Sequence, residues 1–330
     1  MKYIDMHCDT LTRLYDLGAE NTGESLRKNS GHLDLERMRA GEALIQCFAI
    51  FTNLKTQPDP YRYSMAVCDL FWREMEKNRD VISPVLSAED LLKNENQGKM
   101  SALLTIEEGA VCRGETEILR EFYERGARMM TLTWNYPNDL AWPNRIDFER
   151  GIMEPETEKG LTKKGIAFLE EMERLGMIID VSHLGDAGFF EMAEHTKRPF
   201  IASHSNARGA AGNVRNLTDE MIRLLADRGG VMGINFCPAF LSASQSMQKG
   251  GGQSFVRDMV SQMKYIRNVG GIECIGLGSD FDGITGELEV DSPAAFWKIA
   301  DEMHRQGFAA SEIESVFYRN ARRVFTEILH

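Results

Sequence analysis

The chain has 330 residues, of which 43% are hydrophobic and 27% charged, and these fractions are ordinary for a globular protein. The net charge is −12 and the lysines and arginines are scattered, which argues against nucleic acid as a partner. No apolar run approaches the ~20 residues of a membrane span, and no basic segment with an apolar core precedes the first predicted strand. We therefore expect a cytoplasmic protein that begins at Met1 and has no membrane partner.

Short apolar segments that end in polar residues recur along the sequence, with helical patterns between them. These segments span residues 3–7, 43–51, 101–106, 129–134, 177–182, 199–203, 230–236 and 274–279. Buried parallel strands have this form, and about eight of them are what a closed (β/α)8 barrel needs. Strand and helix alternate to the end, so we predict one α/β domain over residues 1–330 with a TIM-barrel fold.

Three helices have the clearest signals. Apolar residues between Leu161 and Leu175 recur at spacings of four and three, and Gly176 follows as the stop. A second helix begins after Thr218 as its N-cap, with acidic residues in its first turn. The last helix opens with Ser311 and Glu314 at the spacing of a capping box.

The longest irregular segments follow predicted strands rather than helices. Asn135 to Gly160 follows the fourth strand, and Cys237 to Gln253, which contains three consecutive glycines, follows the seventh. Loops of this length are usually functional or disordered. In a barrel, the loops after the strands form the active-site face, so we expect the site there.

His7 and Asp9 close the first predicted strand. Alternate residues of a strand share a face, so both side chains point into the barrel mouth while Cys8 points away. An imidazole beside a carboxylate suits a divalent transition metal such as zinc. This pair alone is a weak signal, and the histidines that end later strands strengthen it.

Glu107 and Glu108 follow the third predicted strand. Adjacent strand residues point to opposite faces, so one of the two can face the centre, where a buried charge needs a cation. Ligand geometry favours Glu107 as a bridging carboxylate and leaves Glu108 to the loop. A solvated pair at a strand end is the alternative that spacing leaves open.

Two successive strands each end in Ser-His, at His183 and His204. The 21 residues from one histidine to the other (204 − 183) leave room for a crossover helix, roughly Gly185 to Thr196. The two strands would then be parallel neighbours ~4.8 Å apart, and both histidines could reach one metal ion. Two unrelated core histidines are the alternative.

Charged residues also follow the sixth and the eighth predicted strand. Arg208 or Arg215 could hold a substrate carboxylate through two parallel hydrogen bonds, and spacing does not choose between them. A carboxylate beside an activated water can move its proton, and we favour Asp280 for this task. Asp282 with Gly283 fits an Asp-Gly turn instead.

Together these residues resemble the membrane (renal) dipeptidase family of zinc metallopeptidases, a branch of the amidohydrolase-like barrels. The motifs are HCD at 7–9, TIEEG at 105–109, DVSH at 180–183, SHSNARG at 203–209 with NVRN at 213–216, and GLGSDFDG at 276–283. The resemblance covers nearly the whole chain. It implies a small-molecule peptide substrate and is compatible with a homodimer.

The resemblance also implies a ligand set for two Zn²⁺ ions. His7, Asp9 and the bridging Glu107 would hold one ion, while Glu107, His183 and His204 would hold the other. A hydroxide between the ions would attack the scissile carbonyl. The family pattern further implies that Arg215 binds the substrate carboxylate and that Asp280 shuttles the proton.

One position departs from the family pattern. Where the family usually has a histidine in an LTH context, this chain has LTW, with Trp134. Losing one oxyanion donor can cost ~2.7 to 4 kcal/mol. Trp134 could donate its indole N–H, line the substrate pocket or mark a different substrate, and Asn135 or Asn138 could serve as the donor instead.

Three functions compete on these grounds. The leading prediction is a zinc dipeptidase that cleaves dipeptides with a free C-terminal carboxylate. The second, prompted by Trp134, is a binuclear metal hydrolase of another amide, cyclic amide or ester. The third is a barrel that binds a ligand without catalysis, and the intact metal ligands argue against it.

Overall fold

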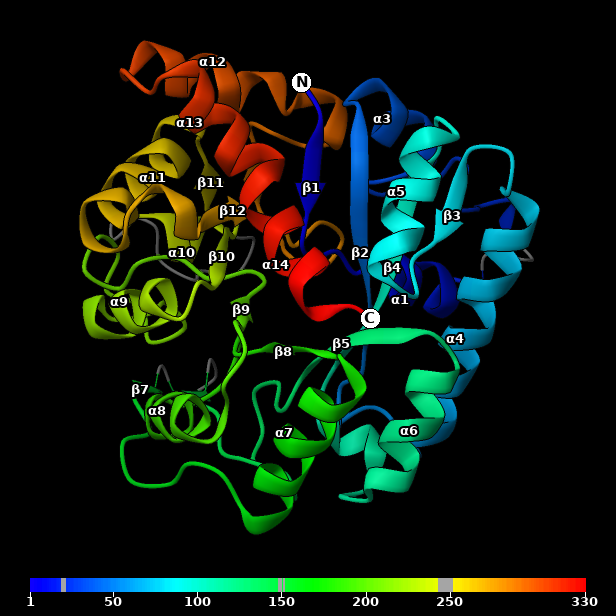
Figure 1. The fold of residues 1–330 in the computed structure, drawn as a ribbon, viewed down its shortest axis with the longest axis vertical. Coiled ribbons are helices and arrows are strands. Elements are labelled where there is room, and N and C mark those ends of the chain that lie inside the picture. The colour runs from blue at the N-terminus through cyan, green and yellow to red at the C-terminus, as the bar shows by residue number, and fades with distance from the viewer. Residues whose placement is uncertain (19–21, 148–149, 151, 243–251) are drawn as a thin grey trace.

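The computed structural model describes residues 1–330 except 19–21, 148–149, 151 and 243–251. Its main sheet has nine parallel strands in the order β2-β1-β12-β10-β9-β8-β5-β4-β3, and an additional pairing between β2 and β4 closes it into a barrel (Figure 1). Because β3 lies outside that closure, eight strands form the ring. This confirms the predicted (β/α)8 barrel.

The ring strands fall within or overlap the eight predicted segments. They are β1 (Tyr3–Asp5), β2 (Ala43–Phe51), β4 (Met100–Glu107), β5 (Ala127–Thr131), β8 (Ile178–Asp180), β9 (Ile201–Ala202), β10 (Val231–Ile234) and β12 (Ile275–Leu277). Nearly all their residues are buried, which is why they read as continuous apolar runs. The strand β3 (Ile82–Pro84), which pairs with β4, was not predicted.

Helices surround the barrel. They are α1 (Thr10–Asp16), α3 (Leu35–Ala40), α4 (Pro60–Lys77), α5 (Ala88–Asn96), α6 (Thr116–Glu124), α7 (Lys163–Leu175), α8 (Asp186–His195), α9 (Asp219–Asp227), α10 (Pro238–Leu241), α11 (Val256–Gly270), α12 (Trp297–Arg305), α13 (Ala310–Glu314) and α14 (Asn320–Ile328). Short 3-10 turns span Gly109–Cys112, Ile272–Cys274 and Pro293–Ala295, and a π-helical turn spans Ser315–Arg319. Among the described residues, no helix is long and apolar enough to cross a membrane.

Local signals explain where several helices begin and end. Thr162 caps α7 by accepting a hydrogen bond from the Gly165 N–H at 3.1 Å, and Gly176 ends the helix at a φ of 72°. Thr218 caps α9 as predicted. The predicted capping box at Ser311 is wrong, because α13 begins two residues earlier, with Ala309 as its N-cap.

The helix α14 closes one end of the barrel and leaves the other end for the site. Its residues Val324, Phe325 and Ile328 pack against inward-facing residues from the starts of the ring strands, such as Ile4 and Ile178. In Figure 1 this helix, coloured red, crosses in front of the strands. The carboxyl ends of the strands therefore face away from α14, toward the longer loops.

The two long loops contain some regular structure. The loop after β5 carries an antiparallel hairpin of β6 (Arg145–Asp147) and β7 (Ile152–Glu154). The loop after β10 begins with α10 and ends at β11 (Gln253–Ser254), which pairs with β13 (Glu287–Leu288). Most of the predicted glycine tract in this loop, at 250–251, lies outside the described residues.

Candidate metal centre

Acidic and histidine side chains from five ring strands converge at the carboxyl end of the barrel. His7 and Asp9 follow β1, Glu107 ends β4, His183 follows β8, His204 follows β9 and Asp280 follows β12. Five of these residues are buried, and the side chain of His183 is 9% exposed. The barrel thus brings together all six predicted metal-ligating and proton-transfer residues, although they span most of the chain.

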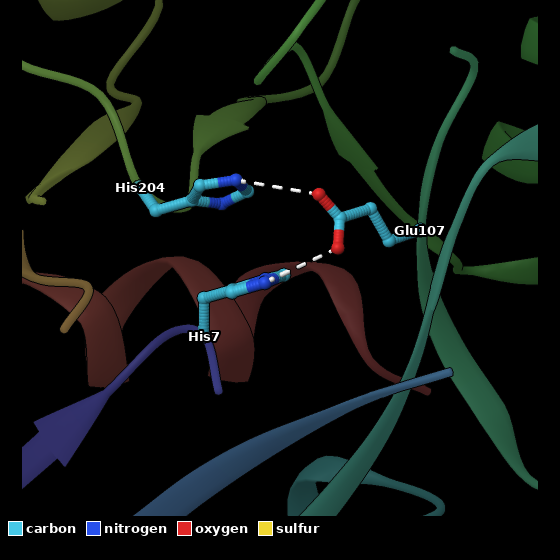
Figure 2. Close-up of side chains that lie close together, drawn as sticks. All are labelled: His7, Glu107 and His204. Carbon is cyan, nitrogen blue, oxygen red and sulfur yellow. Dashed lines mark ion pairs between the residues drawn. The ribbon is translucent and has the colours of Figure 1, made fainter. Parts of the chain in front are cut away.

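The carboxylate of Glu107 lies between two groups of imidazoles. Its Oε2 is 3.4 Å from the Nε2 atom of His7. Its Oε1 is 2.9 Å from the Nε2 atom of His183 and 3.6 Å from that of His204. Figure 2 shows Glu107 reaching toward His7 and His204 with different oxygens. This arrangement suits a carboxylate that bridges two cations.

The closest potential ligand groups both include His7. The atoms of His7, Glu107 and His204 lie within 4.8 Å of one another, and so do those of His7, Asp9 and Asp280. The Nε2 atoms of His183 and His204 are 3.0 Å apart. Two adjoining groups are consistent with a binuclear site. The ligand set predicted from the sequence shares Glu107 instead and does not include Asp280.

Sharp turns after the strands direct two of these side chains into the mouth. His183 has a φ of 70° and Asp280 a φ of 63°, a left-handed backbone that costs most residues on the order of 1 kcal/mol or more. Close approach also requires Gly283, because a Cβ there would lie 2.0 Å from the Oδ2 atom of Asp9. The local backbone is therefore shaped around the cluster.

Two polar atoms of the buried cluster have no hydrogen bond to another protein group among the described residues. Among the described residues, His7 Nε2 and Asp9 Oδ1 are buried without a hydrogen bond. Burial raises the pKa of Asp9 to about 6, and burial with the nearby carboxylates raises the pKa of Asp280 to about 7. Burying such groups unpaired is costly, whereas carboxylates and imidazoles are the ligands of divalent metals such as zinc. The residues present fit a bound metal.

The nearby imidazoles lower the pKa of Glu107, whereas the pKa values of Asp9 and Asp280 are raised. Burial alone would raise the pKa of Glu107, but His7, His183 and His204 hold it well below its usual value. Burial, together with the charge of Arg215, lowers the pKa of His183 to about 3. The carboxylate of Glu107 is therefore ionised and the His183 ring is neutral, which are the forms that bind metals.

Asparagines that the sequence did not single out as supports hold two of the side chains. The Nδ1 atom of His183 lies 2.9 Å from Asn135 Oδ1 and 3.2 Å from the Nε atom of Arg215, so that the Nε2 atom of the ring faces Glu107. Asn235 donates a hydrogen bond of 2.9 Å from its side chain to the Oδ2 atom of Asp280. Neither asparagine forms a recognisable motif, and only the folded barrel brings them to the site.

The structure separates the two candidate arginines. Arg208 forms two hydrogen bonds, of 2.6 and 2.7 Å, to Asp186 at the start of α8. Arg215 is buried beside the metal cluster, where it donates to Ser205 Oγ at 3.0 Å and to the His204 carbonyl at 3.4 Å. Arg215 also lines the cavity above the cluster, whereas Arg208 does not. The guanidinium of Arg208 is thus occupied by Asp186.

A cavity of about 530 Å³ opens over the cluster. Its floor includes Glu107, His183 and Asp280. Its apolar lining residues are Leu17, Phe51, Trp134, Phe240 and Ile284. A cavity with apolar walls and a few charged groups at its floor is typical of a small-molecule site.

A profile of the family described as "Membrane dipeptidase (Peptidase family M19)" matches residues 1–330. The chain belongs to the membrane dipeptidase family. Membership makes it a metallopeptidase of the dipeptidase type, a hydrolase that acts on peptide bonds. The family predicted from the sequence motifs is confirmed.

Relatives in the membrane dipeptidase family agree in sequence and fold. The chain is 30% identical over 267 residues to an uncharacterized protein in the pqqA 5' region of Klebsiella pneumoniae, covering 79% of this chain and 96% of that protein. It is 30% identical over 304 residues to dipeptidase 3 of Rattus norvegicus, covering 90% of this chain but 59% of that longer protein. The crystal structure of dipeptidase AC, a metallo peptidase of family M19, superimposes with a TM-score of 0.89 at 22% identity, covering 100% of this chain and 99% of that chain.

Trp134, the departure from the membrane dipeptidase pattern, forms part of an aromatic wall beside the cluster. Its ring centroid lies 4.9 Å from that of Phe51, 5.4 Å from that of Tyr136 and 6.1 Å from that of His183. The backbone N–H of Trp134 donates to the Oε2 atom of Glu108 at 3.0 Å. Trp134 therefore lines the cavity, and the hydrogen bond from its backbone N–H to Glu108 fixes its position.

Glu108 is a buried anchor of this loop. Its carboxylate accepts hydrogen bonds from the backbone N–H groups of Ala110 and Trp134, both at 3.0 Å, and from the Asn138 side chain. Burial raises the pKa of Glu108 to about 7. The alternative of a solvated glutamate pair is wrong. Asn138, which also donates to the Leu132 carbonyl, is occupied within the loop and unsuited to be an oxyanion donor.

Proposed function

We propose that this chain is a zinc-dependent dipeptidase, a single metallohydrolase domain over residues 1–330 that cleaves dipeptides with a free C-terminal carboxylate. The observation that carries the proposal is the position of Glu107 between His7 on one side and the His183–His204 pair on the other. The family assignment supports it. A cytoplasmic location and a homodimer stay predictions.

In the proposed site, the metal ligands divide into two sets that share Glu107. One set is His7, Asp9 and Glu107, and the other is Glu107, His183 and His204. Two Zn²⁺ ions bound there would lower the pKa of a water molecule and stabilise the charge that develops on the substrate carbonyl. The orphaned atoms His7 Nε2 and Asp9 Oδ1 support such an occupant.

We assign proton transfer to the Oδ1 atom of Asp280. Asn235 holds the other oxygen, Oδ2, at 2.9 Å, so Oδ1 is oriented toward His7, 3.8 Å away. A carboxylate in this position can accept a proton from the attacking water and deliver it to the leaving amine. Asp280 also lines the cavity, as this role requires.

We propose that Arg215 binds the carboxylate of the substrate. Its terminal nitrogens each carry two N–H groups, of which one each is used by Ser205 and by the His204 carbonyl. One N–H on each nitrogen therefore remains for a ligand, the arrangement that a carboxylate accepts in two parallel bonds. Trp134 would form the apolar wall for a substrate side chain.

The test is turnover of dipeptides by the zinc-loaded protein. The panel would contain dipeptides with C-terminal L- and D-residues, and each would be paired with its C-terminal amide. We expect hydrolysis of the free acids and a loss of kcat/KM of at least about tenfold for the amides, because the Arg215 contact is lost. Bound zinc without turnover of any dipeptide would overturn the proposal.

A second candidate is supported by Trp134 alone. With an aromatic wall where the family usually has histidine, the same metal chemistry could act on a cyclic amide or an ester. Assaying these substrates beside the dipeptides distinguishes the two functions. Turnover of cyclic amides or esters with none of dipeptides would establish the second candidate in place of the first.

A further inference from the structure

Two buried aspartates lie at equivalent places in the barrel, and the proposed chemistry uses neither. Asp5 is the last residue of β1, and Asp180 is the last residue of β8. They are 0% and 2% exposed. Each follows an isoleucine and precedes a predicted metal ligand by two or three residues. Buried carboxylates need partners, and both aspartates find them on the neighbouring strand.

Asp180 joins the end of β8 to the end of β9. Its Oδ1 atom accepts hydrogen bonds from the backbone N–H groups of Ser182, at 3.0 Å, and Ser203, at 2.9 Å. Its Oδ2 atom accepts a hydrogen bond of 2.5 Å from the hydroxyl of Ser203. We call this pair, Asp180 and Ser203, the Asp180 clasp.

Asp5 joins the end of β1 to the end of β12 in the same way. Its Oδ1 atom accepts from the backbone N–H groups of His7, at 3.4 Å, and Ser279, at 2.8 Å. Its Oδ2 atom accepts a hydrogen bond of 2.6 Å from the hydroxyl of Ser279. This pair, Asp5 and Ser279, is the Asp5 clasp. The same three kinds of donor thus recur in two parts of the barrel, and Asp5 Oδ2 accepts a fourth hydrogen bond, of 3.0 Å, from the side chain of Gln46 on β2.

The two clasps differ in what the serine touches next. Ser203 Oγ lies 2.6 Å from the Nδ1 atom of His204. A serine hydroxyl has one proton, and here it points to Asp180, so the serine oxygen accepts from the His204 Nδ1–H group. That tautomer leaves the Nε2 atom of His204 free toward Glu107. By contrast, Ser279 Oγ lies 3.3 Å from the backbone carbonyl of His7 and reaches no imidazole in the described part of the chain.

We propose that Asp180 is a positioning residue that sets the tautomer of the metal ligand His204 through Ser203, whereas the comparable Asp5 clasp joins strand ends without contacting a metal-ligand ring. Outer hydrogen-bond partners of metal ligands commonly contribute 10- to 100-fold to metal affinity. The inference rests on the proposed function only in taking His204 as a zinc ligand.

The matched variants are Ser203→Ala and Ser279→Ala, since each removes one hydroxyl donor to one buried aspartate. Zinc affinity would be measured by competition with a chelator, and the thermal midpoint would be measured on the metal-free proteins. We expect S203A to weaken one of two zinc ions by about 10- to 100-fold, and S279A to leave both affinities within about threefold. Equal zinc affinities in the two variants would overturn the inference.

Asp180→Asn tests whether Asp180 sets the tautomer of His204 or only fills space in the core. This variant also provides the test if S203A does not fold. The amide oxygen can still accept the two backbone N–H groups, while the amide nitrogen donates to Ser203 and turns the serine proton toward His204. The ring then carries its proton on Nε2, where zinc should bind. We expect D180N to lose at least about tenfold in zinc affinity. Unchanged affinity in D180N would contradict the inference.

The same measurements keep this inference separate from the proposed function. A wild-type protein that binds fewer than two zinc ions would contradict the proposed binuclear site. Two ions bound by the wild type, with S203A and D180N unchanged, would contradict the role of Asp180 alone. Nitrogen NMR of the His204 ring adds a readout independent of zinc: the proton should lie on Nδ1 in the metal-free wild type and on Nε2 in D180N.

Discussion

The metal centre has two halves that are stabilised in different ways. In the carboxylate half, His7 and Asp9, which follow β1, face Asp280, and two of the buried atoms have no hydrogen-bond partner among the described residues. In the histidine half, the rings of His183 and His204 are oriented by Asn135 Oδ1 and Ser203 Oγ. The histidine half is held by protein hydrogen bonds, whereas the carboxylate half needs a cation to satisfy its charges.

The comparison shows that one site can combine histidine rings held in place by hydrogen bonds with carboxylates that repel one another. Hydrogen-bonded ring nitrogens fix the histidines before any ion arrives, so little ordering is needed on binding. The like-charged carboxylates of Asp9, Glu107 and Asp280 repel one another until a cation lies between them. We therefore expect the two halves to respond differently to substitution and to pH.

The largest effect should come from Glu107, which touches both halves. Glu107→Gln keeps the size of the side chain but replaces one oxygen with an amide group that cannot bind a cation. We expect both zinc ions to bind at least about 100-fold more weakly, exceeding the usual loss for an outer partner, and dipeptide turnover to vanish. Elemental analysis after dialysis would measure the zinc content.

The neighbouring glutamate provides a matched control for this experiment. Glu108→Gln makes the same chemical change one residue away, at a carboxylate whose partners are backbone N–H groups and Asn138. E108Q should retain both zinc ions. Loss of zinc from both variants would show that the bridging role does not belong to Glu107 alone.

The next largest effect should come from substitutions that each remove a ligand from one half of the metal centre. Asp9→Asn removes a carboxylate from one half, and His204→Asn removes a ring from the other. We expect each variant to keep about one zinc ion per chain with strong binding and to lose more than about 100-fold in affinity for the other. Isothermal titration with zinc would count the sites. If either substitution abolished both ions, the halves would form one indivisible site.

A smaller effect should come from Arg215, which borders the histidine half. Arg215→Lys keeps the charge but loses the fork that binds a carboxylate through two bonds. We expect KM for dipeptides to rise by roughly 10- to 100-fold, the value of a charge-assisted hydrogen bond. Steady-state kinetics would measure it.

Arg208→Lys serves as the control for Arg215. Arg208 is bound to Asp186, so its substitution should lower the thermal midpoint and leave KM close to that of the wild type. An unchanged KM in R215K, or an equal rise in both variants, would assign the substrate carboxylate to another residue.

The last effect concerns pH in the metal-free protein. Burial and Arg215 lower the pKa of His183 to about 3, so the unfolded chain binds this proton first. Stability should then fall as the pH drops from about 6.5 toward 3, by up to about 1.4 kcal/mol per pH unit. His183→Asn should flatten this slope in urea unfolding curves measured between pH 5 and 7.

His7 in the carboxylate half should show the opposite sign. Burial would lower its pKa, but Glu107 and Asp9 outweigh burial and raise the pKa well above 6.5. The folded state then holds the proton more tightly, so its contribution is full below about 6.5 and is lost as the pH rises through the folded pKa. His7→Asn should therefore destabilise the metal-free protein more at pH 6 than at pH 9. Equal loss at both values would contradict this sign.

Strand positions and ligand identities could be predicted from the sequence because each depends on local pattern. A buried parallel strand is a continuous apolar run, and the polar residue after it must lie at the mouth of a barrel. This logic was enough for His7, Glu107 and His204. It could not predict β3, a three-residue strand whose Pro84 belongs at a sheet edge.

Several contacts that support the site from distant segments were beyond prediction. The burial of Glu108 depends on the loop that carries Trp134, and spacing along the chain does not reveal that loop's path. Spacing along the chain does not choose between Arg208 and Arg215, whereas the fold binds Arg208 to Asp186 and places Arg215 at the cavity. Asp180 belongs to the DVSH motif, but its partner Ser203 lies 23 residues away, after another strand.

The pairing of β1 with β12 also bears on when the enzyme can assemble during synthesis. The hydrogen bond from Ser279 to Asp5 joins residues separated by 274 positions. Contacts of such long range form slowly, and during translation the second partner emerges long after the first. A nascent chain that has exposed His183 and His204 therefore still lacks the strand that completes the other half. Both halves of the metal centre can therefore form only after synthesis has reached Asp280, which follows β12.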